Sequence, residues 1–238
     1  MGRNNYFQFK QFKIIQEKSA MKVGTDGVLL GAWVEPKDAE TILDVGTGTG
    51  LIAIMLAQRS YAKITAVEIE ENAAQEAAEN VRNSIWHDRI SVHHISFQEF
   101  VETTGNTFDL VVSNPPFFTH AVKNSAKNKA LARHTDQLPF YKLIQGTAKL
   151  LNSDGRLAVI LPLSEAKDFI ETSVFFSLYL NRRTEIKPAP SRETNRVLLE
   201  FSKNAGTFQS ESLTILCNDG FTYSEEYKNL TGDFYLNF

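Results

Sequence analysis

The chain has 238 residues, of which 42% are hydrophobic and 22% are charged, as in folded globular proteins and unlike disordered ones. A formal net charge of −3 argues against a protein that coats nucleic acid non-specifically, and the lack of an apolar run of about 18 residues argues against a membrane-spanning helix. The single cysteine, Cys217, cannot form an internal disulfide, and residues 1–10 carry no apolar stretch of a secretory signal, so we expect a cytoplasmic protein.

In chain order, short β-type runs alternate with helical patterns from residue 41 onward. Strands are expected at 41–45, 63–68, 90–95, 108–113 and 156–161. Helices are expected at 51–58, 70–83, 139–151 and 164–176, the third ended by a turn at 152–155 and the last capped by Ser164. Three further strands, at 178–187, 196–202 and 213–217, follow without helices between them. This order predicts an α/β fold with a doubly wound, mostly parallel sheet and an antiparallel edge.

A glycine-rich segment joins the first expected strand to the first expected helix. Its glycines, Gly46, Gly48 and Gly50, let the backbone turn tightly and let a ligand approach closely, with Thr47 between the first two. Their Gly-x-Gly-x-Gly spacing departs from the dinucleotide fingerprint Gly-x-Gly-x-x-Gly. Asp44, just before them, would repel a pyrophosphate but suits a ligand with a positive ammonium or sulfonium group.

The segment 44–50 and the following Val67-Glu68-Ile69 resemble motifs I and II of the class I methyltransferases. The resemblance implies a Rossmann-like domain with a seven-stranded sheet and S-adenosyl-L-methionine as the cofactor. It also implies that the glycine loop wraps the methionine part and that Glu68, with Ile69 beside it, binds the ribose hydroxyls. The family often places Asp after the third strand, whereas this sequence has Ser96 and Phe97, which we expect to hydrogen-bond and to pack on the adenine ring.

The tetrapeptide Asn114-Pro115-Pro116-Phe117 directly follows the expected strand 108–113. An exocyclic amine is a poor nucleophile, and the Asn114 side-chain oxygen and the Pro115 carbonyl can accept its protons and aim its nitrogen at a methyl donor. The prolines stiffen the backbone, and Phe117 can stack on a flat base. The tetrapeptide resembles the Asn-Pro-Pro-Tyr/Phe motif of amino-methyltransferases, which act on adenine N6, guanine N2, cytosine N4 or a glutamine amide.

The segments flanking these motifs extend the resemblance over nearly the whole chain. Residues 9–12, 21–33, 133–135, 196–202, 223–227 and 234–236 are similar to the bacterial tRNA1(Val) adenine-37 N6-methyltransferase family. The resemblance implies methylation of adenine 37, next to the anticodon of a valine tRNA. We expect Lys22, Thr25 and Asp26 near the methionine end of the cofactor; alternatively, Asp26 only caps a packing helix.

Basic residues gather in three segments that are poor in acids, at the N-terminus, between 110 and 135, and between 182 and 192. Such clusters are usually solvated surface, but together they can form one phosphate-binding face. The expected substrate contacts are Lys10, Lys13, Pro116, Phe118, Lys123, Lys127, Lys129, Arg133, His134 and Arg192.

We therefore expect one methyltransferase domain over residues 1–238. Residues 1–40 form an extension that covers the cofactor and contacts the substrate, and residues 41–238 form the catalytic core. No metal and no obligate protein partner are expected. The alternatives are an amino-methyltransferase that acts on guanine N2 of ribosomal RNA or on a protein glutamine, a nicotinamide-dependent oxidoreductase, and a non-enzymatic RNA-binding module.

Overall fold

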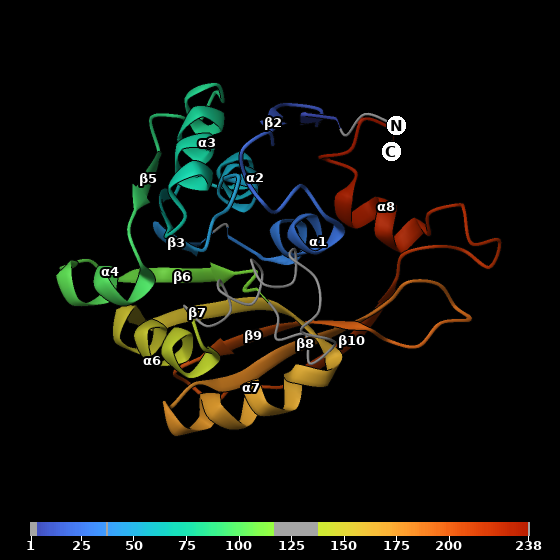
Figure 1. Ribbon diagram of the computed structural model, residues 1–238. Helices are drawn as coiled ribbons and strands as arrows, with labels where there is room; N and C mark the ends of the chain where they lie inside the picture. Colours follow the sequence, from blue (N-terminus) through green and yellow to red (C-terminus); the bar gives the residue numbers. More distant parts are fainter. Residues whose placement is uncertain (1–3, 37, 117–137, 238) are drawn as a thin grey trace, which may run out of the picture.

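The computed structural model describes residues 4–36, 38–116 and 138–237. Eight strands form one sheet in the order β10-β8-β9-β7-β6-β3-β4-β5 (Figure 1). In chain order they are β3 (Thr41–Val45), β4 (Lys63–Glu68), β5 (Ile90–His94), β6 (Phe108–Ser113), β7 (Leu151–Pro162), β8 (Tyr179–Lys187), β9 (Arg196–Ser202) and β10 (Gln209–Thr214). β9 runs antiparallel to both of its neighbours, and the other neighbouring pairs of this sheet are parallel.

The strand order reverses between β3 and β6. The chain builds β4 and β5 on one side of β3, and then β6 and β7 on the other. In open α/β sheets, ligands bind outside the carboxyl ends of the strands at such a switch point. Val45 and Ser113, the last residues of β3 and β6, are partners in the register, and the Ser113 hydroxyl donates to the Val45 carbonyl at 2.9 Å. The structure therefore fixes the ends of these two strands side by side.

Helices cover both faces of the sheet (Figure 1). One core packs under α1 (Thr25–Trp33), α2 (Leu51–Arg59) and α3 (Glu71–Arg82). The other packs under α4 (Phe97–Thr103), α6 (Phe140–Leu150) and α7 (Leu163–Phe175). β6 contributes Leu110 and Val112 to the first core and Val111 to the second, which explains its nearly continuous apolar sequence. Among the described residues, no helix is long and apolar enough to cross a membrane.

Both ends of the described chain pack on the α1 side of the sheet. The hairpin of β1 (Tyr6–Gln8) and β2 (Lys13–Ile15) carries Phe9, which stacks on Phe12 and on Tyr235 with ring centroids 4.6 and 5.9 Å away. The backbone N–H of Lys10 donates to the Phe234 carbonyl at 2.8 Å. α8 (Glu225–Thr231), which leads into this C-terminal segment, lies beside α1 and contacts it (Figure 1). The N-terminal extension is therefore held by the other end of the chain.

The doubly wound, mostly parallel architecture is confirmed, and the expected seven strands are corrected to eight. The antiparallel pairing expected at this end of the sheet is present and belongs to β9, while the outermost strand, β10, runs parallel to β8. β10 spans Gln209–Thr214 rather than the expected 213–217. The polar residues at the start of β10 gave no strand pattern in the sequence, because an edge strand needs few apolar residues. They are held by backbone pairing with β8 and by an ion pair between Glu211 and Arg182 at 3.3 Å.

Two local predictions about β7 and α7 were wrong. The expected turn at 152–155 is part of β7, where the pairing with β6 shifts between Phe108 and Leu110 and the extra residues form a bulge. Glycine is required at position 155, because a Cβ there would lie only 2.8 Å from the Phe108 carbonyl oxygen and would clash with it. Ser164 does not cap α7, since the helix begins at Leu163 with Pro162 as its N-cap residue and no side-chain cap.

Candidate active site

The glycine loop after β3 has the backbone that its sequence predicts. Gly46, Gly48 and Gly50 have φ angles of 71°, 57° and 81°, a region that favours glycine. A Cβ at Gly46 or Gly48 would meet no atom within 4 Å, so the backbone here borders open space. The N–H groups of Gly46 and Thr47 donate to the Val67 carbonyl at 2.9 and 3.1 Å, which ties the loop to the end of β4. The loop is thus both fixed and open to a ligand.

Asp44 lies fully buried beneath this loop. Its Oδ2 accepts hydrogen bonds from the Thr47 hydroxyl at 2.6 Å and from the Ala53 N–H at 3.2 Å. Burial, with a smaller contribution from the nearby Glu68, raises the pKa of Asp44 to about 7 despite these two bonds. Oδ1 is buried and has no hydrogen-bond partner among the described residues. The observed contacts make Asp44 an organiser of the loop, and its contact with the cofactor stays a prediction.

Glu68 ends β4 next to the glycine loop. Its carboxylate accepts from the Gly48 N–H at 2.9 Å and from the Glu70 N–H at 3.0 Å. Each carboxylate oxygen can accept more than one hydrogen bond, so both retain capacity for a ligand hydroxyl. The next side chain, Ile69, is large, apolar and 39% exposed. An acid beside an exposed apolar surface suits a ribose and the ring attached to it.

The residues after β5 are arranged differently from the expectation. Ser96 is the N-cap of α4, and its hydroxyl accepts from the Glu99 N–H at 3.1 Å. Phe97 is only 4% exposed, and its ring packs against α6 so closely that a Cβ on Gly146 would lie 2.6 Å from it. Because the ring is buried in the core below α4, little of its surface is left for stacking on an adenine.

The tetrapeptide begins where β6 ends, beside the glycine loop. Asn114 and Pro116 are half-buried and Pro115 is buried. The Asn114 Oδ1 is buried and, within the described part of the chain, has no hydrogen-bond partner. A buried amide oxygen without a partner is costly, so such an atom suits a donor supplied by a ligand. Phe117 lies outside the described residues.

Of the residues expected at the methionine end, Lys22 and Thr25 are exposed. The ammonium of Lys22 donates to the Asn4 carbonyl at 3.4 Å. Asp26 does not cap α1, whose N-cap residue is Gly24 without a side-chain cap. Instead, its Oδ2 accepts from the Arg196 Nε at 2.9 Å. Arg196 was not among the site residues expected from the sequence, because nothing in the local pattern connects it with a residue 170 positions away.

The expected substrate contacts among the described residues lie in separate segments of the chain. Lys10 donates to the Gly232 carbonyl at 2.6 Å, Lys13 lies over the Tyr6 ring at 5.4 Å, and Arg192 is exposed between β8 and β9. Seven of the expected residues lie outside the described ones: Phe117, Phe118, Lys123, Lys127, Lys129, Arg133 and His134.

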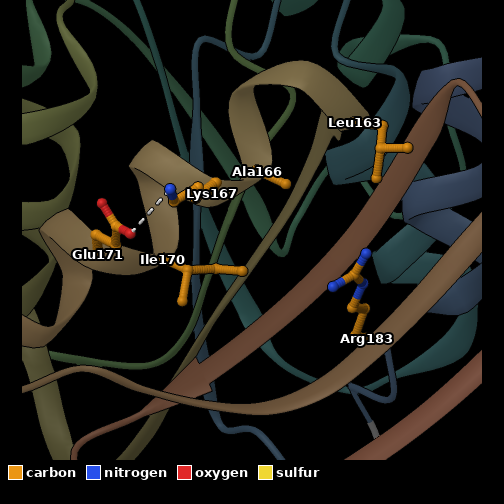
Figure 2. A pocket seen from close by; sticks show the side chains of 6 residues that line it. All are labelled: Leu163, Ala166, Lys167, Ile170, Glu171 and Arg183. Carbon is orange, nitrogen blue, oxygen red and sulfur yellow. Dashed lines mark ion pairs between the residues drawn. The ribbon is translucent and has the colours of Figure 1, made fainter.

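A cavity of about 270 Å³ lies elsewhere, between α7 and β8. Figure 2 shows Arg183 of β8 across from α7, where Lys167 and Glu171 form an ion pair at 3.8 Å. Leu163, Ala166 and Ile170 supply its apolar wall. None of these six residues belongs to the predicted site, which is built instead on the ends of β3, β4 and β6.

Known proteins resemble the chain in both sequence and fold. The family model described as "Methyltransferase small domain" matches residues 19–172. A tRNA1(Val) (adenine(37)-N6)-methyltransferase from Trichodesmium erythraeum is 48% identical over 98% of this chain and 99% of its own length. Another relative with that name, from Flavobacterium psychrophilum, is 45% identical over 97% and 99%.

The chain belongs to the tRNA1(Val) (adenine(37)-N6)-methyltransferase family.

Solved structures agree on the fold of this family member. A predicted O-methyltransferase from Agrobacterium tumefaciens superposes with a TM-score of 0.71 at 20% identity, covering 88% of this chain and 96% of that one. A methyltransferase from Pyrococcus furiosus gives 0.52 at 20% identity, over 74% and 80%. The sheet is thus that of a class I methyltransferase, and the chain is an S-adenosylmethionine-dependent enzyme.

Proposed function

We propose that this enzyme transfers a methyl group from S-adenosylmethionine to N6 of adenine 37 in the anticodon loop of a valine tRNA. The observation that carries the proposal is the buried Oδ1 of Asn114, which has no hydrogen-bond partner among the described residues and lies at the strand end beside the glycine loop. Relatives of 42–48% identity over nearly the whole chain carry the corresponding name. An acceptor at this place is what an exocyclic amine requires.

The residues of the glycine loop and of β4 fit the cofactor. Glu68 would accept hydrogen bonds from the ribose hydroxyls, and Ile69 would contact the adenine. The open backbone at Gly46 and Gly48 would receive the methionine part. Below it lies the Oδ1 of Asp44, to which no residue that the structure describes donates a hydrogen bond. When bound, S-adenosylmethionine supplies an electrophilic methyl group on a sulfonium.

The tetrapeptide would orient the nucleophile. The Oδ1 of Asn114 and the carbonyl of Pro115 would accept the two protons of the adenine amino group. These bonds draw the nitrogen lone pair out of conjugation with the ring and aim it at the methyl donor. Holding the reacting atoms in line removes orientational entropy from the barrier. The nitrogen would gain the methyl group as the methyl–sulfonium bond breaks, which leaves a neutral thioether, and it would release one proton to solvent.

An anticodon loop suits this geometry. The base must leave its stack to reach Asn114, and this costs little in a single-stranded loop. RNA loops are bound through stacked bases and phosphate contacts, which Phe117 and the basic residues at 123–133 would supply. We further propose that residues 1–238 act as one domain in the cytoplasm without an obligate protein partner, since the extension and the C-terminal segment pack on the same core.

The deciding experiment incubates the enzyme with labelled S-adenosylmethionine and total tRNA and identifies the labelled nucleoside. We expect N6-methyladenine in valine tRNA; labelled guanine or labelled protein would refute the proposal. Asn114→Ala should lower turnover by about 10²–10³-fold with unchanged cofactor affinity. Asn152→Ala is the matched control, because its side chain donates to Asp109 at 2.6 Å on the opposite edge of the sheet and should leave turnover unchanged.

A further inference from the structure

We propose that Glu76 and Asn80 of α3 are positioning residues that hold residues 15–26, the N-terminal strap, against the glycine loop. The ion pair between Asp26 and Arg196 fixes the other end of the strap. The inference rests on the proposed function in one respect, namely that S-adenosylmethionine binds at the carboxyl ends of β3 and β4, where the strap forms a wall of its site.

Glu76 binds the strap through three consecutive backbone N–H groups. Its Oε2 accepts from Glu17 and Lys18 at 2.6 and 2.7 Å, and its Oε1 accepts from Ser19 at 3.1 Å. The side chain is 1% exposed, so the carboxylate relies on these donors instead of water. Displacing this part of the strap would leave a buried carboxylate without its partners, which gives the strap one preferred position.

Asn80, one helical turn further along α3, joins the strap region to the cofactor loop. Its Oδ1 accepts from the Ile15 N–H at 2.8 Å, and its Nδ2 donates to the carbonyls of Ile15 and Thr49, both at 2.9 Å. The side chain is also 1% exposed. One amide therefore sets the distance between the start of the strap and the glycine loop.

The other end of the strap reaches the start of β9. Arg196, the partner of Asp26, opens this strand and is paired in register with Pro162 of β7. In the sheet, β6 and β7 lie between β3 and β9. The strand end that carries Asn114 therefore lies between the two anchors. Figure 1 shows the chain passing from β2 to α1 on this side of the molecule.

Between its anchors, the strap is closed by its own contacts. The Oε1 of the buried Gln16 accepts from the Val23 N–H at 2.8 Å, and the Ser19 hydroxyl donates to the Met21 carbonyl at 2.9 Å. Because the strap is held together by its own hydrogen bonds, a displacement of its backbone at Glu76 would also displace Lys22, the residue expected at the methionine end of the cofactor.

The test is Glu76→Gln, which keeps the size of the side chain but replaces an acceptor by a donor. Cofactor affinity is measured by titration of the full chain with S-adenosylmethionine in the absence of tRNA. We expect the dissociation constant to rise about tenfold, and the KM for S-adenosylmethionine to rise with it while kcat stays within about threefold of the wild type. Amide hydrogen exchange at residues 17–19 should accelerate.

The matched control is Asp109→Asn. This carboxylate also accepts backbone N–H groups, from Glu40 and Thr41 at 3.0 and 2.9 Å, but at the amino ends of the strands. It should lower the melting temperature without changing cofactor affinity. If Glu76→Gln changes cofactor affinity no more than the control does at equal loss of stability, the positioning role is refuted.

A charge exchange tests the second anchor. Asp26→Arg and Arg196→Asp should each weaken cofactor binding, and the double variant should recover at least part of the loss. If the double variant binds no better than the single ones, the ion pair does not anchor the strap. All of these affinities are measured without RNA, so a wild-type enzyme that fails to methylate tRNA would refute the proposed substrate and leave this test intact.

Discussion

Asp44→Asn removes a carboxyl group that is fully buried beneath the glycine loop, and it should change how stability depends on pH. Burial raises the pKa of Asp44 from 3.8 to about 7, outweighing the hydrogen bonds from Thr47 and Ala53. The unfolded chain keeps the ordinary value, so the folded protein binds more protons between the two. Stability from this group is therefore lost as the pH rises from 3.8 to about 7.

The size of the effect follows from the two pKa values. At 1.36 kcal/mol per pKa unit, the difference between 3.8 and about 7 corresponds to about 4 kcal/mol of stability lost once the pH is well above 7. Roughly 2 kcal/mol of this falls between about pH 5.5 and pH 8.5, a range in which most other carboxyl groups are already ionised.

The assay is urea unfolding of the wild type and of Asp44→Asn across that pH range. The asparagine buries an amide without a full set of partners, but this penalty does not depend on pH, so the difference between the two curves isolates the charge. We expect the stability of the wild type relative to the variant to fall by about 2 kcal/mol. A difference that is flat, or that rises with pH, would contradict the burial argument.

Asp109→Asn serves as the control with the opposite sign. Burial alone would raise the pKa of Asp109, but hydrogen bonds from Asn152, Thr41 and Glu40 together lower it. A lowered pKa contributes stability that is lost only as the pH falls below the ordinary value of 3.8. Its difference curve should therefore be flat between about pH 5.5 and pH 8.5.

Three further predictions concern the loop, the core and the substrate. Gly48→Ala has room for its Cβ but a φ of 57°, so it should cost about 1 kcal/mol and weaken cofactor binding; equal affinity in titration would count against the loop geometry. Gly146→Ala places a Cβ 2.6 Å from the Phe97 ring and should cost about 1–3 kcal/mol in urea unfolding with unchanged cofactor affinity. Charge reversal at Lys127 and Arg133 should weaken tRNA binding and make it less dependent on salt, while cofactor binding stays unchanged. An unaltered tRNA affinity across a salt series would contradict the proposed basic face.

Strands with a strong local pattern could be predicted from the sequence. β3, β4 and β6 have the expected bounds, because each is a nearly continuous apolar run buried on both faces. The short elements could not: the β1–β2 hairpin, α4 and α8 have three to seven residues per element and depend on contacts with distant segments. The bulge at 152–155 resembles a turn locally, and only the pairing of β7 with β6 and β9 makes it part of a strand.

The candidate site likewise contains residues that the sequence could place and residues that it could not. Gly46, Glu68 and Asn114 lie at strand ends, where the topology alone brings the carboxyl ends of β3, β4 and β6 together. Phe97 was expected to contact the cofactor because of its place after β5, but an aromatic residue in the first turn of a helix is drawn into the core when that helix packs on another. The position of a residue in the sequence therefore predicted which strand end it lies near, but not whether its side chain points toward the site or into the core.

Glu76 and Asn80 show what a local pattern conceals. In an Ala- and Glu-rich helix, an acid or an amide is ordinarily read as solvated, although the helical spacing puts positions 76 and 80 on the buried face of α3 that Ala73, Ala77 and Val81 share. Their partners, residues 15–19, lie 57 to 65 positions away. A buried carboxylate is tolerated only where several donors converge on it, and that convergence is a property of the assembled fold. If the strap is positioned in this way, the cost of burying Glu76 is met by the same backbone groups that Glu76 holds in place, so that stability and cofactor binding depend on one set of hydrogen bonds.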